Sequence, residues 1–250
     1  EAGDSPPTFR IFQWERPSIT IGSAQDEAEV IDLDLCGRDG IPVARRPTGG
    51  RAVLHDNEVA FSVIGFRGDA LFGNSIADAF GFMGTVIKRA CGSFGLELSG
   101  DAADTTPAPR FGIGKAPCFL TSSRHEVTWR GKKIAGIAQR RYTRVFLQQG
   151  SILTGGGHER ILRYIPRCGD YAALGEALRN RAVDLATALG RDVDTGALAC
   201  GLFMSFAWAA GTEPVPGTVT DKELREAKCG MDVYSVPVKR EVSHEQHNCI

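Results

Sequence analysis

The alternation of hydrophobic and polar residues predicts β-strands through most of the first two-thirds of the chain. Short runs that alternate, or that are rich in β-branched residues, are typical of strands, and turn-forming residues separate them here. The strands at 52–54 and 59–65 flank a short polar turn, so we expect them to pair as a hairpin in one sheet. The full set of expected strands covers residues 8–14, 18–22, 52–54, 59–65, 124–129 and 133–141, with a strand pair in 145–153.

Two helices are expected among these strands, and helices dominate after residue 160. Apolar residues three and four apart predict the second helix, which Asn74 or Ser75 is expected to cap, and residues 220–223 have the form of a capping box that starts the last helix. Because strands dominate residues 8–154 and helices residues 160–230, the sequence indicates one α+β domain that spans residues 1–250. The full set of expected helices covers residues 26–35, 76–91, 171–189, 198–210 and 219–229.

The composition is that of an ordinary globular protein and argues against several classes of partner. Of 250 residues, 42% are hydrophobic and 24% are charged, and the net charge is -1. This balance gives no overall field that would attract nucleic acid or a membrane surface. The longest apolar run, near residues 197–211, is too short to cross a bilayer, and the first residues lack a signal-peptide pattern. We therefore expect a cytoplasmic protein with no nucleic-acid or membrane partner.

Seven cysteines are scattered along the chain without a CxxC pair. An odd, scattered set argues against a disulfide framework or a closed zinc site and favours free thiols in a reducing compartment. The histidines form no convincing catalytic or metal set. His244, His247 and Cys249 lie in the last seven residues, which we interpret as a polar tail. We expect no metal.

Residues 45–55, with the sequence RRPTGGRAVLH, combine three arginines with a Gly-Gly pair. Gly49 and Gly50 have no Cβ, so the backbone there can approach a ligand closely. Arg45 and Arg46 offer fixed sets of donors to a carboxylate or phosphate. One interpretation is a loop that holds an acidic or acyl ligand against a sheet edge. The other is a basic surface turn before a strand, and these residues alone leave both open.

Cys118 stands apart from the other cysteines because glycine- and proline-containing loop residues precede it and an expected strand follows. Lys133 lies fifteen positions further on, across the expected hairpin. We expect the returning strand to bring Lys133 level with the start of the first strand, near the thiol. A nearby cation favours the thiolate, which attacks thioesters, and a lysine can hold or return the proton. The alternative is an inert buried cysteine beside a solvated lysine.

Four segments resemble signatures of the lipoate–protein ligase and octanoyltransferase superfamily. Residues 45–55 resemble RRxxGGxxVxH, and residues 131–139 (GKKIAGIAQ) resemble GKK[IV][AS]GSAQ. Residues 148–153 (QQGSIL) are similar to QHGSIL, and residues 9–22 are similar to the family's first strands. The segments occur in family order and at family spacing. The resemblance implies an α+β fold with a mixed sheet, of the biotin/lipoate protein ligase type.

The resemblance also implies the site. It implies a tunnel for a medium-chain acyl group that is roofed by residues 45–55, with Lys133 as the catalytic lysine. The backbone at Gly136 and Ala138 would flank the acyl carbonyl, and basic residues including Arg140 and Arg141 would dock an acidic carrier. The substrate-binding residues implied in this way are Arg45, Arg46, Gly49, Gly50, His55, Gly136, Ala138 and Gln139.

Cys118 makes the chain similar to the cysteine-dependent octanoyltransferases of this superfamily. Pro117, Cys118 and Phe119 are followed after six residues by Glu126, as in that branch, whereas the ATP-dependent ligases need no cysteine. The implied reaction needs no cofactor. It moves an octanoyl group from acyl-carrier protein to the Cys118 thiolate and then to a lysine of a lipoyl domain or of the glycine-cleavage H protein.

Other interpretations stay open because the signatures are not followed throughout. Ile137 and Gln149 stand where serine and histidine are usual. Ile137 makes the second signature closer to the amidotransferases that move octanoyl or lipoyl groups between protein lysines. An ATP- and Mg-dependent lipoate ligase and a non-catalytic acyl-binding protein are further alternatives. The family's N-terminal helix is not found in the chain, as expected if the N-terminus is trimmed or the chain is part of a longer protein.

Overall fold

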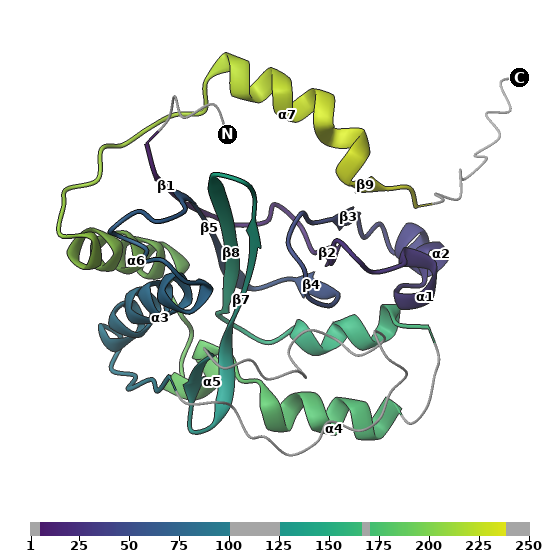
Figure 1. Ribbon diagram of the computed structural model, residues 1–250. Helices are drawn as coiled ribbons and strands as arrows, with labels where there is room; N and C mark the ends of the chain where they lie inside the picture. The colour runs from purple at the N-terminus through teal and green to yellow at the C-terminus, as the bar shows by residue number, and fades with distance from the viewer. Residues whose placement is uncertain (1–5, 101–125, 167–170, 239–250) are drawn as a thin grey trace, which may run out of the picture.

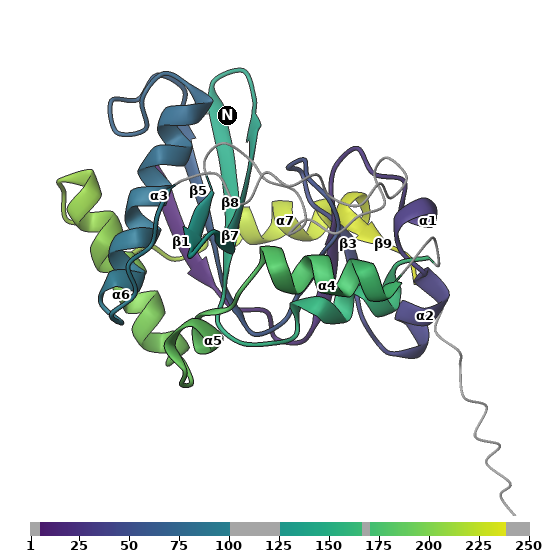
Figure 2. The same ribbon diagram turned by 90° about the horizontal axis from the view of Figure 1, so that it is seen from below.

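The computed structural model describes residues 6–100, 126–166 and 171–238. Within these ranges the chain forms two β-sheets with helices around them (Figures 1 and 2). Cys118, the start of the strand expected at 124–129, and the histidines of the C-terminal tail lie outside the described residues. The expectations that rest on them stay predictions.

The larger sheet has five strands in the order β1-β5-β8-β7-β6, and every neighbouring pair is antiparallel. These strands are Thr8–Phe12 (β1), Glu58–Phe66 (β5), Val145–Leu153 (β8), Lys132–Arg141 (β7) and Val127–Trp129 (β6). The smaller sheet has the order β4-β2-β3-β9, and its β2 and β3 run parallel. Its strands are Val53–His55 (β4), Ser18–Ile21 (β2), Val43–Arg45 (β3) and Ser235–Val236 (β9). The α+β class is confirmed, but the strands divide between two sheets.

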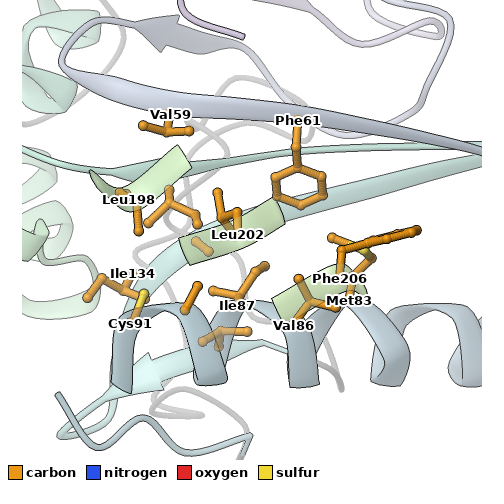
Figure 3. Packing of buried hydrophobic residues seen from close by; sticks show 14 of the residues in the cluster. Val59, Phe61, Met83, Val86, Ile87, Cys91, Ile134, Leu198, Leu202 and Phe206 are labelled. Carbon is orange, nitrogen blue, oxygen red and sulfur yellow. The ribbon is translucent and has the colours of Figure 1, made fainter. Parts of the chain in front are cut away.

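Helices α3 (Ile76–Gly92) and α6 (Thr195–Ala210) cover one face of the larger sheet (Figure 3). Side chains such as Phe61 of β5, Ile87 of α3 and Leu202 of α6 are completely buried between the layers. Each such side chain contributes about 1.5–3 kcal/mol through its removal from water. This apolar cluster is the main core, and it fixes the position of β5, β8 and β7.

Helix α3 begins where the sequence predicts, at Ser75. The Ser75 hydroxyl accepts a hydrogen bond from the Asp78 amide (3.0 Å), and the Asp78 carboxylate accepts one from the Ser75 amide (2.8 Å). This reciprocal capping box satisfies backbone donors that the first helical turn leaves without partners. Thr220 and Glu223 cap α7 (Asp221–Tyr234) in the same way, which confirms the second predicted capping box.

The smaller sheet has a core of its own. Ile19 and Ile21 of β2 pack with Tyr164 of the 3-10 helix η2 (His158–Tyr164) and with Leu178 of α4 (Tyr171–Arg181). The remaining short helices are α1 (Glu27–Val30), α2 (Leu33–Arg38) and α5 (Leu185–Leu189). Leu153, the last residue of β8, joins this second core. The two sheets therefore meet where β8 ends.

The predicted hairpin between residues 52–54 and 59–65 is wrong. Strand β4 pairs with β2, with Leu54 opposite Ile19, whereas β5 pairs with β1 on one side and β8 on the other. Both edges of β5 are thus already occupied, so β4 cannot pair with it. The chain changes direction at Asn57, which has a left-handed backbone (φ 51°) that asparagine tolerates.

Three other predicted elements are divided differently in the structure. The helix expected at 26–35 is two helices, because Asp26 and Asp32 each accept an amide hydrogen bond that starts a new helix. The helix expected at 171–189 breaks before α5, where the Val183 amide bonds to the Lys133 carbonyl (3.0 Å) and Asp184 caps the next helix. Residues 145–153 form one strand rather than a pair.

Helix α7 stands apart from the rest of the fold and lies along the top of the view in Figure 1. It contains no buried residue, and it leads into β9 at the edge of the smaller sheet. Among the described residues, no helix combines the length and apolar character needed to cross a membrane.

Candidate active site

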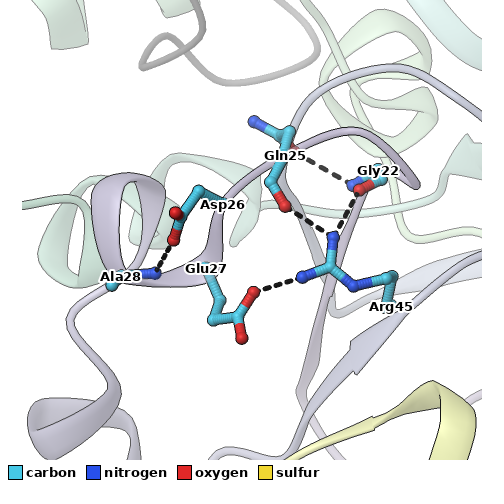
Figure 4. Close-up of polar contacts among 6 residues, drawn as sticks. All are labelled: Gly22, Gln25, Asp26, Glu27, Ala28 and Arg45. Carbon is cyan, nitrogen blue, oxygen red and sulfur yellow. Dashed lines mark hydrogen bonds and ion pairs between the residues drawn. The ribbon is translucent and has the colours of Figure 1, made fainter.

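Arg45, at the end of β3, binds the protein's own backbone (Figure 4). Its guanidinium donates to the Gln25 carbonyl (2.5 Å) and the Gly22 carbonyl (3.3 Å), and it forms an ion pair with Glu27. These contacts join the end of β2 to the start of α1. The structure therefore places Arg45 as a support for the loop that follows it.

Arg46 holds the Gly-Gly loop in shape from the inside. Its guanidinium donates to the Gly49 carbonyl (3.0 and 3.2 Å) and to the Arg51 carbonyl (2.7 Å). It also donates to the backbone and side-chain oxygens of Thr20 (3.1 and 3.2 Å). Because these bonds join the guanidinium to the carbonyls of the loop and to Thr20, the loop is wrapped around the guanidinium. Docking of a carrier by Arg45 and Arg46 stays a prediction that these contacts do not support.

The loop lies over the face of the larger sheet rather than at a sheet edge. Thr48 is completely buried and its hydroxyl donates to the Gln149 side chain of β8 (3.2 Å). Arg140 of β7 donates to the Pro47 carbonyl (3.0 Å). Gly50 has a left-handed backbone (φ 98°), and its carbonyl presses so closely on Gly22 that a Cβ there would lie 2.0 Å from it. The loop is thus fixed to both sheets.

The sheet face beneath the loop contains small residues at Gly136, Ala138 and Ser151. Gly136 pairs with Ser151 and Ala138 pairs with Gln149, so these four positions share a face. The Thr48–Gln149 contact shows that this is the face the loop covers. Small side chains leave room next to the backbone, which is what a ligand lying along the sheet requires. The structure therefore places Gly136 and Ala138 on the face to which Pro47 and Thr48 bind the loop. Binding of a substrate by Gly136, Ala138 and the Gly-Gly pair stays a prediction.

Gln139 does not share the face of Gly136 and Ala138, because its side chain points to the opposite face of the sheet. It donates to Gln148 (2.9 Å) and accepts from Arg141 (3.2 Å). Gln148 is completely buried and donates in turn to the Ala79 carbonyl of α3 (3.3 Å). These bonds satisfy polar groups inside the main core, where an unsatisfied group would be costly. The predicted substrate contact through the Gln139 side chain is not supported by this placement.

His55 lies behind the loop with both ring nitrogens engaged. Its Nδ1 is 2.6 Å from the Glu58 carboxylate and its Nε2 is 2.7 Å from the Thr20 hydroxyl. The indole of Trp14 stacks on the imidazole at 4.4 Å. The sequence pattern placed Glu58 in the polar turn between residues 54 and 59, which is wrong: Glu58 begins β5 and is buried.

Lys133, near the start of β7, forms a buried ion pair with Glu126. Its Nζ lies 2.7 Å from a Glu126 oxygen, and both side chains are almost completely buried. An ammonium and a carboxylate taken out of water together stabilise each other's charge and fix each other's position. The lysine that the second signature marks is therefore rigidly held.

The predicted position of Lys133 within the hairpin is wrong. It pairs with Thr128, close to the turn, and not with the start of the preceding strand. The turn consists of Arg130 and Gly131, both with left-handed backbones, so the return strand begins at once. Cys118 lies outside the described residues. Proximity of its thiol to Lys133 stays a prediction, which the hairpin register no longer supports.

Two of the described cysteines are unsuited to nucleophilic chemistry. Burial raises the pKa of the Cys91 thiol to about 12, and burial together with nearby Asp32 and Asp39 raises the pKa of the Cys36 thiol to about 12. Both thiols are therefore protonated at neutral pH, and a protonated thiol is a poor nucleophile. Cys200 and Cys229 are exposed.

Sequence reasoning missed the partners that hold the site together. In the sequence, Thr20 was one residue of an expected strand, and Thr48 occupied a position that the first signature leaves unspecified. Gln149 was noted only as a departure from the family pattern, and Glu126 only as part of a motif. Thr20, Thr48 and Glu126 are polar residues at positions that the structure buries, and Gln149 is half-buried. This burial becomes visible only when the strand pairing is known.

Comparison with known proteins agrees with this geometry. The family described as the lipoyl protein ligase A/B catalytic domain matches residues 1–206. An octanoyltransferase LipM from Kyrpidia tusciae is 31% identical over 235 residues, which cover 93% of this chain and 86% of the relative. An octanoyltransferase LipM from Symbiobacterium thermophilum is 34% identical over 230 residues, or 90% and 83% of the two chains.

Solved structures show the same fold. A crystal structure of lipoate-protein ligase A bound with ATP superposes with a TM-score of 0.71 at 23% identity, covering 92% of this chain and 83% of that one. A bi-partite lipoate protein ligase from Thermoplasma acidophilum gives a TM-score of 0.72 at 23% identity, with 92% and 81% covered. The chain belongs to the lipoyl protein ligase A/B catalytic domain family.

Proposed function

We propose that this protein is an octanoyltransferase that serves protein lipoylation. The observation that carries the proposal is the similarity to octanoyltransferases over about nine-tenths of the chain. The site geometry supports it, because a rigid buried lysine, small residues on a sheet face and a loop above them are suited to holding an acyl chain. The acceptor is a lysine of a lipoyl domain or of the glycine-cleavage H protein.

The first step that we propose is transfer of the octanoyl group to Cys118. The Cys118 thiolate attacks the carbonyl carbon of octanoyl-acyl-carrier protein, and the carbon–sulfur bond to the carrier breaks. The carrier leaves as a thiolate and takes up a proton. One thioester is exchanged for another, so the reaction needs no cofactor.

In the second step the acceptor lysine attacks the octanoyl thioester of Cys118. An amide bond forms, the bond to the Cys118 sulfur breaks, and the amine loses a proton. Lys133, held by Glu126 at 2.7 Å, would orient the acyl carbonyl and balance the charge of the departing thiolate. The rigid ion pair provides this orientation without reorganisation during the reaction.

Mass spectrometry of the intact protein mixed with octanoyl-acyl-carrier protein tests the proposal. We expect one octanoyl group on wild type and none on Cys118→Ser. Cys200→Ser, which removes an exposed thiol, is the matched control and should acquire the group like wild type. An adduct that persists in Cys118→Ser would contradict the cysteine mechanism.

The same experiment separates the alternatives. Octanoylated H protein as a second donor distinguishes an amidotransferase, which would accept the group from it. An ATP-dependent ligase would instead exchange pyrophosphate with ATP in the presence of lipoate and would tolerate Cys118→Ser. A non-catalytic binder would bind octanoate and transfer it from no donor.

A further inference from the structure

A continuous chain of side chains runs from the buried carboxylate of Glu58 to the Gly-Gly loop. Glu58 is bonded to His55 (2.6 Å), His55 to Thr20 (2.7 Å), and Arg46 to Thr20 (3.2 Å). The chain passes from β5 of the larger sheet through β4 and β2 of the smaller sheet. It therefore links both sheets to the loop.

The two ends of this series of hydrogen bonds have a fixed direction. Arginine can only donate, so the Thr20 oxygen accepts from Arg46. A carboxylate accepts, so His55 Nδ1 donates to Glu58. Between these two bonds, the Thr20 hydroxyl and His55 Nε2 share one hydrogen bond of 2.7 Å. A guanidinium thus stands at one end of the series and a carboxylate at the other, and neighbouring bonds in such a network can polarise one another.

The surroundings hold the imidazole in this orientation. The Glu58 side chain is 1% exposed and the His55 side chain is 12% exposed, so water competes little for their bond. Trp14 stacks on the ring with an interplanar angle of 18° and restricts its tilt. Thr20 is itself buried within β2. The imidazole is thus placed by three independent contacts.

At its Arg46 end, this series of hydrogen-bonded side chains determines the conformation of the Gly-Gly loop. Thr20 gives Arg46 two acceptors, the backbone oxygen and the hydroxyl, and the remaining donors of Arg46 bind the carbonyls of Gly49 and Arg51. The guanidinium is planar and rigid, so its orientation at Thr20 also sets the positions of those two carbonyls. We infer that Glu58, His55 and Thr20 are positioning residues that act through Arg46 to hold the Gly-Gly loop over the acyl site.

Limited proteolysis tests this positioning without reference to activity. Because Arg46 and Thr48 hold the loop closed, we expect trypsin to cut after Arg51 when the loop opens, and the proline at 47 protects the bond after Arg46. Thr20→Val keeps the shape of the side chain and removes the hydroxyl, whereas Thr20→Ser keeps the hydroxyl. We expect Thr20→Val to raise the rate of cleavage after Arg51 by about tenfold, as for loss of a hydrogen bond to a charged group. Thr20→Ser should cleave like wild type.

Cleavage after Arg89 is the internal control, because Arg89 lies in α3, which packs in the main core and opens only when that core opens. If Thr20→Val raises both cleavage rates equally, the hydroxyl stabilises the protein globally and the inference is wrong. The same holds if the rate after Arg51 is unchanged, or if Thr20→Ser behaves like Thr20→Val. A second pair of variants tests the Glu58 end of the series. Glu58→Gln keeps an acceptor for His55 and should cleave after Arg51 like wild type, whereas Glu58→Leu removes the acceptor and should cleave faster.

Kinetics provide a second readout, which rests on the proposed function. A misplaced loop should weaken binding of the acyl group, so Thr20→Val should raise the KM for octanoyl-acyl-carrier protein several-fold with kcat nearly unchanged. A merely structural role would lower kcat by lowering the folded fraction and leave KM unchanged. If the wild-type protein transfers no octanoyl group, the proposed function is wrong. The proteolysis result still shows whether Glu58, His55 and Thr20 position the loop.

Discussion

The two faces of the five-stranded sheet are built from the same strands but for different purposes. Toward α3 and α6, alternate residues such as Val59 and Phe61 of β5 are completely buried in an apolar core. Toward the Gly-Gly loop, the intervening residues are small or polar, as at Ala60 and Ser151, which pair with each other. Because side chains alternate along a strand, one face can supply stability while the other is free to form a site.

The largest expected effect comes from the buried ion pair. Lys133→Met leaves the Glu126 carboxylate without its ammonium, which should cost about 3–5 kcal/mol of unfolding free energy. It should also lower kcat for octanoyl transfer by at least about 100-fold. Urea denaturation and transfer kinetics measure the two quantities.

The double variant Lys133→Met/Glu126→Leu separates stability from chemistry at this pair. Replacing both charges with apolar side chains should recover most of the lost stability, because no uncompensated charge remains. Activity should stay at the level of Lys133→Met. Recovery of transfer in the double variant would show that Lys133 serves only the fold.

Truncation on the apolar face should affect stability alone. Phe61→Ala removes a completely buried ring, and we expect a loss of about 3–5 kcal/mol in unfolding free energy. Under conditions where the variant is folded, its KM for the octanoyl donor should equal that of wild type within twofold. A large change in KM would mean that the two faces are not separable in function.

A substitution in the Gly-Gly loop should change KM and have the smallest effect on the unfolding free energy. A Cβ added at Gly49 would meet no atom within 4 Å, and its backbone needs no left-handed conformation. Gly49→Ala should therefore change the unfolding free energy by less than about 0.5 kcal/mol. If the acyl chain lies against this loop, the added methyl should raise KM several-fold. An unchanged KM would place the acyl chain elsewhere.

The sequence predicted the elements that local pattern controls. Helix α3 and its cap at Ser75, and the capping box at Thr220 and Glu223, depend on neighbours within one helical turn. The long strand β5 was recognisable from its β-branched run. These features follow from spacing and side-chain chemistry within a few residues.

Features that depend on pairing between distant segments were not predictable in the same way. The division into two sheets arises because β1 and β8 occupy both edges of β5. Burial of Glu58 follows from that division, since a polar turn pattern does not reveal which residue begins the next strand. The side-chain direction of Gln139 depends on its register with Gln148. Motif resemblance marked Lys133, but its partner Glu126 became clear only with the hairpin register.

The most direct test of the account is a single-turnover transfer from the octanoylated protein. The protein is loaded with octanoyl-acyl-carrier protein, separated from the donor, and mixed with a lipoyl domain and, separately, with glycine-cleavage H protein. We predict that the octanoyl group leaves the protein and appears on a lysine of at least one acceptor, without ATP. An octanoyl group that stays on the protein, or that is released only as free octanoate, would contradict the account.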